Sequence, residues 1–206
     1  MPTQSEIKIR SLTEADLDQV LAIEQASFPL PWSHDHFAGE LEGRHSFPFV
    51  AESDDKIAGY VCLMSLFEEA QILDIAVSPE QRGRGIARML LEHAISVARK
   101  QAAEVLALEV RASNVAAITL YEQCGFVRTG LRRNYYEGRE DAVLMEKRLS
   151  FTALDQGSRR RLGFMSGEIA VPDDFDRMDN GSSLTGGATD SPLPARKDVT
   201  SKTVEQ

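Results

Sequence analysis

The chain of 206 residues has few of the side chains that hold structural metals or build disulfide frameworks. Its two cysteines, Cys62 and Cys124, stand far apart, and neither they nor the four histidines have the spacing of a zinc site. Cys124 also has no histidine at a distance typical of a nucleophilic cysteine. We therefore expect no metal, no disulfide and no covalent cysteine chemistry.

Long apolar runs and excess positive charge are also missing. No apolar run approaches the roughly 20 residues of a membrane-spanning helix, and the N-terminus lacks the apolar segment of a signal peptide. Asp and Glu outnumber Lys and Arg by 32 to 23, so the formal net charge is −9 at pH 7. Such a field disfavours nucleic acid and suits a basic partner. We expect a cytoplasmic protein that binds neither membranes nor nucleic acid, and its oligomeric state stays open.

The composition changes near Ser150. Residues 151–206 contain paired glycines and serines, three prolines and scattered acidic residues, but no Trp, Tyr or Cys. Such a segment buries too little apolar surface to offset its ordering entropy. We therefore expect one domain over residues 1–150, which is long enough for a hydrophobic core, and a flexible, disordered tail over residues 151–206.

Before Ser150, the apolar pattern predicts a mixed α/β fold. Helices are expected after the capping residues Thr13 and Ser33, from Ala87 onward, and from Asn114 to Gln123. Strands are expected over residues 7–10, 49–52, 57–66, 72–77, 105–110, 126–136 and 142–147. The resulting order is β-α-α-β-β-β-α-β-α-β-β.

The segment from Ile72 to Ala87 is the most informative part of the chain. An apolar strand passes through a Ser-Pro turn into Gly83-Arg84-Gly85, and an amphipathic helix follows directly. The first N–H groups of a helix have no partner within the helix, and the helix dipole adds partial positive charge there. Glycines let a bulky anion come close to these groups, so the segment predicts a site for a diphosphate.

The details of this loop distinguish between cofactors. No third glycine completes a dinucleotide fingerprint, and no Gly-Lys-Ser/Thr indicates a nucleotide triphosphate loop. The observed pattern is Arg82-x-x-Gly85-x-Ala87, although a plain strand–turn–helix connection can also produce it. It resembles the pyrophosphate loop of the GCN5-related N-acetyltransferases, which bind acetyl-CoA.

Three polar residues downstream have both a structural and a chemical interpretation. Glu109 stands one position before the end of a predicted strand, so it either faces solvent at an edge or lies in a cleft as a general base. The Arg-x-Ser-Asn turn that follows favours the cleft. Asn114 can cap the next helix, contact a cofactor, or do both. Tyr121 is either a packed, hydrogen-bonded tyrosine or a phenol directed at a thioester sulfur.

The run Leu-Glu-Val-Arg-x-Ser-Asn-x-x-Ala-x-x-Leu-Tyr-x-x-x-Gly-Phe, from Leu108 to Phe126, resembles the ribosomal-protein-alanine N-acetyltransferases of that superfamily. Separate motifs around Phe28–Ser33, Glu69-Ala70 and Arg132–Ala142 agree, so the resemblance covers about residues 5–150. It implies an α/β acetyltransferase fold, a mixed central sheet flanked by helices. It also implies that Glu109 is the general base and that Tyr121 protonates the coenzyme A thiolate. The implied cofactor contacts are Ile75, Ala76 and Val77 through the backbone, Arg82, Gly83, Arg84, Gly85, Ile86 and Ala87 at the pyrophosphate, and Asn114.

The family's acceptor is the N-terminal alanine of the eighteenth small-subunit ribosomal protein, so the implied partner is a basic N-terminal peptide. Glu68, Glu69 and Asp74 could receive that peptide or form a solvated rim. Of Tyr135 and Tyr136, we expect one to pack inward and the other to line the peptide groove. Two rival functions stay open: acetylation of lysine side chains or small amines, and a non-catalytic acetyl-CoA-binding scaffold.

Overall fold

The chain is described here from a computed structural model, in which residues 6–149 are defined. The tail predicted over residues 151–206 lies outside these described residues. Within residues 6–149, no helix combines the length and the apolar character needed to cross a bilayer.

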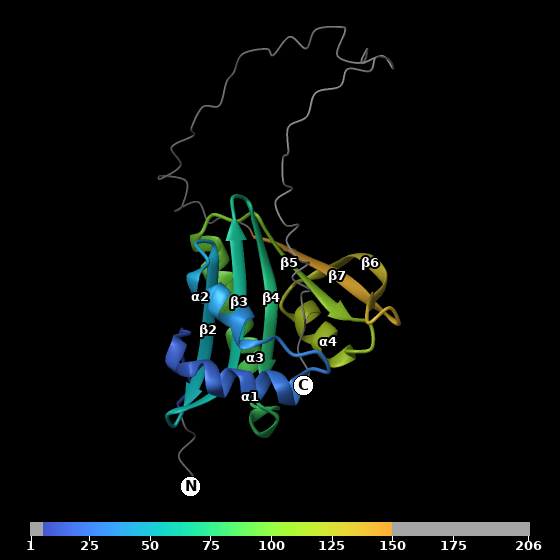
Figure 1. The fold of residues 1–206 in the computed structure, drawn as a ribbon. Helices are drawn as coiled ribbons and strands as arrows, with labels where there is room; N and C mark the ends of the chain where they lie inside the picture. The colour runs from blue at the N-terminus through green and yellow to red at the C-terminus, as the bar shows by residue number, and fades with distance from the viewer. Residues whose placement is uncertain (1–5, 150–206) are drawn as a thin grey trace, which may run out of the picture. The chain divides into compact units, whose positions relative to one another are not determined.

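A seven-stranded mixed sheet with the order β1-β2-β3-β4-β5-β7-β6 forms the centre of the described chain (Figure 1). All its neighbouring strands run antiparallel except β4 and β5, which run parallel. The strands are β1 (Lys8–Ser11), β2 (Ser46–Ser53), β3 (Lys56–Leu66), β4 (Glu69–Val77), β5 (Val105–Arg111), β6 (Val127–Tyr136) and β7 (Glu140–Arg148). The helices are α1 (Leu17–Ser27), α2 (His34–Glu42), α3 (Ile86–Lys100) and α4 (Val115–Gln123), with 3₁₀ turns η1 (Glu14–Asp16) and η2 (Pro79–Gln81). This order confirms the predicted one.

Local sequence signals explain where the first elements begin. The Thr13 backbone N–H and hydroxyl both donate to Asp16 Oδ2, at 2.9 and 2.7 Å, which forms a capping box before α1. Ser33 and His36 make the equivalent box at α2. Between β2 and β3, Asp54 and Asp55 adopt φ of 51° and 59°, the left-handed pair that a tight hairpin turn requires and that Asp tolerates.

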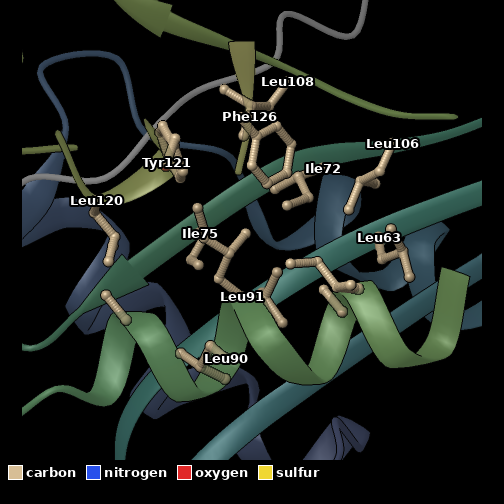
Figure 2. Packing of buried hydrophobic residues seen from close by; sticks show 14 of the residues in the cluster. Leu63, Ile72, Ile75, Leu90, Leu91, Leu106, Leu108, Leu120, Tyr121 and Phe126 are labelled. Atoms are coloured by element: carbon tan, nitrogen blue, oxygen red, sulfur yellow. The ribbon is translucent and has the colours of Figure 1, made fainter. Parts of the chain in front are cut away.

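Two apolar cores lie on opposite faces of the sheet. One core joins the sheet to α3 and α4, and Figure 2 shows it with Leu91 of α3 beside Ile75 of β4. The other core joins α1 and α2 to the opposite face, where Trp32, 5% exposed, packs against Phe37 with ring centroids 5.3 Å apart. The predicted apolar face of α3 is confirmed, since Ala87, Leu90, Leu91, Ala94, Ile95 and Ala98 are all buried. Because alternate residues of each strand enter different cores, a strand position fixes the face on which its side chain acts.

Candidate active site

The parallel strands β4 and β5 separate near the middle of the sheet. Their pairing covers only Glu69 with Val105, Ala70 with Leu106, and Gln71 with Ala107. Beyond these pairs both strands continue, β4 to Val77 and β5 to Arg111, without facing each other in the ladder. Figure 1 shows the two strands diverging toward their carboxyl ends. A parallel sheet is therefore open on the side where both strands end, which is where ligands of α/β proteins bind.

The open edge of β4 presents backbone groups from alternate residues. The Ser78 N–H donates to the Ala58 carbonyl at 2.9 Å, so these two residues face each other as a hydrogen-bonded pair. Two residues earlier on β4, Ala76 stands opposite Tyr60 of β3. Hydrogen-bonded pairs alternate in an antiparallel ladder, so Ala76 bonds to β3 while Ile75 and Val77 turn their backbone groups toward β5. The Val77 carbonyl is consistent with this orientation, because it accepts a hydrogen bond from Arg82 Nε at 3.3 Å. Ile75 and Val77 thus offer backbone groups to the opening, and the contact predicted for Ala76 stays a prediction.

The loop from Arg82 to Ala87 has the backbone that its glycines predict. Gly83 and Gly85 have φ of 73° and 79°, and a Cβ at either position would meet no protein atom within 4 Å. The left-handed backbone, rather than crowding by the protein, therefore requires glycine at both positions. Within the described chain, none of the N–H groups from Gly83 to Arg88 donates to a backbone carbonyl. These free donors at the start of a 15-residue helix form an anion site.

A pocket of about 270 Å³ lies directly against this loop. Its walls are Val77 of β4, the loop and first turn of α3, and the outer face of α4. The lining residues from the predicted cofactor set are Val77, Arg82, Gly83, Gly85, Ile86 and Ala87. Arg84 instead lines a second hollow on the other side of the loop, together with Lys56 and Glu80. Five of the six predicted loop residues therefore face the pocket beside α4, and Arg84 does not.

Glu109 lies on the opposite side of the sheet from this pocket. Its neighbours Leu108 and Val110 enter the core beneath α3 and α4, so alternation turns Glu109 to the other face. The residue is only 7% exposed, and the interpretation as a solvent-facing edge carboxylate is therefore wrong. Its Oε1 lies 2.9 Å from Arg132 Nη1, whereas its buried Oε2 has no hydrogen-bond partner in the described chain. One carboxylate oxygen thus remains available to accept a proton.

Tyr135 completes the surroundings of Glu109. Burial and the adjacent Glu109 carboxylate raise the pKa of the Tyr135 phenol to about 12. Tyr135 is half-buried and Tyr136 is buried, which confirms that one tyrosine of the pair packs inward. Arg132 and Tyr135 both lie on β6, two strands away from Glu109 in the sheet, so no local sequence signal indicates that they meet the carboxylate.

Tyr121 is on α4, in the core on the pocket side of the sheet. Its side chain is fully buried and its ring contacts Phe126 at a centroid distance of 5.8 Å (Figure 2). The hydroxyl has no hydrogen-bond partner in the described chain, unlike the satisfied hydroxyl of an ordinary packed tyrosine. Burial, with the nearby Tyr136 and Asp74, raises the pKa of this phenol well above 10. The phenol therefore keeps its proton at neutral pH, as a proton donor must.

Asn114 has the structural role that its position predicts. Its Oδ1 accepts from the Ala117 N–H at 3.1 Å and caps α4. Asn114 does not line the pocket beside the loop, so its predicted contact with a cofactor stays a prediction.

Other candidates contribute little to the site. Glu69 is exposed at the first position of β4, eight residues before the opening at Val77, and the exposed Glu68 precedes it, so both form a solvated rim at the far end of the strand. Asp74 is completely buried on the face that α1 and α2 cover, with Oδ2 3.3 Å from the Tyr60 hydroxyl. Tyr60 also donates to Glu24. No group of three His, Cys, Asp or Glu residues suited to a metal occurs among residues 6–149.

Comparison with known proteins agrees with this geometry. Residues 17–126 match the family model described as the acetyltransferase (GNAT) family. The chain is 41% identical over 140 residues to proteins named ribosomal protein bS18-alanine N-acetyltransferase from Escherichia coli K12 and Salmonella typhimurium. These alignments cover 66% of this chain and 94% of each relative. The crystal structure of the Escherichia coli ribosomal-protein-S18-alanine N-acetyltransferase superposes with a TM-score of 0.67 at 39% identity, covering 71% of this chain and 96% of that one.

Proposed function

The chain belongs to the acetyltransferase (GNAT) family, and we propose that it transfers the acetyl group of acetyl-CoA to the N-terminal alanine of ribosomal protein bS18. The observation that carries this proposal is the opening between β4 and β5, with an anion site on one side and a buried carboxylate on the other. The names of the relatives supply the acceptor.

Acetyl-CoA suits the side of the opening that holds the pocket. Its diphosphate is the bulky anion that the free N–H groups from Gly83 to Arg88 can bind. Val77 and the outer face of α4 then line the space for the pantetheine arm. The backbone groups of Ile75 and Val77 lie where the arm ends, at the open edge of β4. We propose these residues, with the other predicted loop positions and Asn114, as the cofactor contacts.

The acceptor amine suits the other side, next to Glu109. An α-ammonium has a pKa near 7.7–8.0, so most of it is protonated at neutral pH and cannot attack a carbonyl. Glu109 Oε2 accepts one proton, directly or through a water molecule, and frees the nitrogen lone pair. The nitrogen attacks the thioester carbon through the gap between the strands, and an N–H on the β4 edge stabilises the oxyanion that forms.

Collapse of the intermediate breaks the bond between carbon and sulfur and leaves the electron pair on sulfur. The Tyr121 hydroxyl donates its proton to this thiolate, and a phenol held neutral by burial is suited to that role. The two proton transfers take place on opposite faces of the sheet. Both substrates can therefore be bound at once without either blocking the other, so no covalent enzyme intermediate is needed.

The charge of the protein is consistent with a ribosomal substrate. The net charge of −9 attracts a basic polypeptide and increases its rate of encounter. Ribosomal proteins are made in the cytoplasm, and we propose that the enzyme acts there.

A peptide panel tests the proposal. The panel contains a peptide with the first residues of bS18, the same peptide with a blocked α-amine and a free lysine, and one with a different first residue. Release of coenzyme A thiol and intact mass are measured with the wild-type protein and with Glu109→Gln. We expect one acetyl group on the free α-amine of alanine. Acetylation of the blocked peptide on lysine would assign the chain to the lysine-directed alternative, and no thiol release from any peptide would make it a binding protein.

A further inference from the structure

The ion pair between Glu109 and Arg132 neutralises the carboxylate that the acceptor ammonium must approach. Arg132 Nη1 lies 2.9 Å from Glu109 Oε1, which is hydrogen-bonding distance for a cation on a carboxylate. The carboxylate side chain is 9% exposed and the arginine side chain is 53% exposed. The pair therefore joins a fixed, buried anion to a cation with free access to water.

The local shape of β6 makes this contact possible. Arg132 pairs with Ala142 and Tyr136 pairs with Glu140, so three residues of β6 stand opposite one residue of β7. Asn134 within this bulge has φ of 50°, and its N–H donates to Asp141 Oδ1 at 2.8 Å. A regular strand turns residues three apart to opposite faces, but the bulge brings Arg132 and Tyr135 together. The guanidinium carbon lies 4.9 Å from the centroid of the Tyr135 ring.

An arginine at this position has a defined electrostatic effect. Its guanidinium carries a positive charge and has no acceptor atom, so it neutralises Glu109 without accepting the proton of the reaction. While it is paired, however, it occupies one oxygen of the carboxylate that the proposed reaction uses. It also repels an α-ammonium that approaches Oε2, the other oxygen of the same carboxylate. Displacement of the arginine removes this repulsion before the amine transfers its proton.

We propose that Arg132 is a displaceable counterion of Glu109, which holds the buried carboxylate in the free enzyme and is exchanged for the α-ammonium of the substrate. The inference rests on the proposed function, in which Glu109 faces the acceptor amine. The exchange preserves the charge balance at Glu109, since one cation leaves as another arrives. Arg132 moves into water, where its guanidinium is fully solvated, and Tyr135 remains beside the carboxylate. Arg132 is thus a positioning residue that competes with substrate binding.

Arg132→Gln tests this competition, with Arg133→Gln as the matched control. Both changes remove one positive charge from the same exposed stretch of β6, but of these two arginines only Arg132 has an ion pair within the described chain. The measurements are KM and kcat for the free-amine peptide and the inhibition constant of its N-acetylated product. For Arg132→Gln we expect KM to fall roughly two- to fivefold, as for the loss of a partly exposed ion pair. We expect kcat to change less than about twofold and product inhibition to stay the same, because the product carries no ammonium.

Other outcomes would overturn the proposal. A rise in KM for both Arg132→Gln and Arg132→Lys would make Arg132 a substrate contact, and equal changes for amine and product would indicate a structural role. An equal fall in KM for Arg133→Gln would show that the fall for Arg132→Gln comes from the change in net charge alone. If the wild-type protein does not acetylate the peptide, the proposed function fails. If it does and Arg132→Gln leaves KM unchanged, only the counterion role fails.

Discussion

Replacement of Tyr121 by Phe should make the protein slightly more stable and far less active. The Tyr121 hydroxyl is fully buried and has no hydrogen-bond partner within residues 6–149. Burying a hydroxyl without a partner costs about 1–3 kcal/mol in mutational data. Phe removes that cost and keeps the ring contact with Phe126, so we expect the free energy of unfolding to rise by about 1 kcal/mol. For a chain of this size that corresponds to roughly 2–4 °C in Tm.

The same change removes the proposed proton donor to the coenzyme A thiolate. Loss of a general acid typically slows a reaction by about 10²–10⁴-fold, which corresponds to a barrier increase of roughly 3–5 kcal/mol. We therefore expect kcat to fall by that factor while acetyl-CoA affinity stays the same, since the hydroxyl is no part of the diphosphate site. Single-turnover kinetics, calorimetric titration with acetyl-CoA and thermal unfolding are the three measurements.

Tyr60→Phe is the matched control for stability. Tyr60 is also fully buried, but its hydroxyl donates to Glu24. Removing a hydrogen bond to a buried charged group costs about 1–3 kcal/mol, so Tyr60→Phe should lower Tm. The same chemical change thus has opposite signs at the two positions. A drop in Tm for Tyr121→Phe, or a kcat within a few-fold of wild type, would refute the reasoning and leave Tyr121 as an ordinary core residue.

Two further predictions concern Glu109 and Asp16. Glu109→Gln keeps the shape of the side chain but cannot accept a proton, so kcat should fall by at least about 10²-fold with acetyl-CoA affinity unchanged; wild-type turnover would remove Glu109 from the base role. The Arg10 guanidinium holds the pKa of the Asp16 carboxyl well below its usual range. The resulting stability is present above the unfolded-state value near 3.8 and is lost as pH falls toward the folded-state pKa. Thermal unfolding from pH 7 downward should show this loss, Asp16→Asn should flatten it, and equal pH profiles for both proteins would contradict it.

Much of the fold follows from local sequence signals. Apolar periodicity and the capping residues Thr13, Ser33 and Asn114 give the elements and their order, because these signals act within a few residues of chain. Gly83 and Gly85 are equally local, since a backbone with positive φ disfavours other residues. The predicted loop and helix therefore correspond closely to the structure.

The arrangement around the carboxylate depends on contacts between distant strands. The β4–β5 pairing stops after Gln71, and nothing in either strand indicates where parallel neighbours separate. Alternation along β5 shows that the Glu109 side chain points to the face of the sheet opposite that of Leu108 and Val110. Which helices cover each of these faces depends, however, on where the helices pack. Arg132 reaches Glu109 across β7 through a bulge set by a left-handed Asn134. Such contacts depend on sheet order and register, which periodicity alone does not determine.

The most direct measurement is a crystal structure of the protein with coenzyme A joined covalently to the N-terminus of a bS18 peptide. The account predicts diphosphate oxygens within hydrogen-bonding distance of the N–H groups between Gly83 and Arg88. It also predicts that the linker passes between β4 and β5, with the sulfur on the side of Tyr121, the peptide nitrogen on the side of Glu109, and Arg132 displaced. A conjugate bound elsewhere, or a peptide and coenzyme on the same face of the sheet, would contradict it.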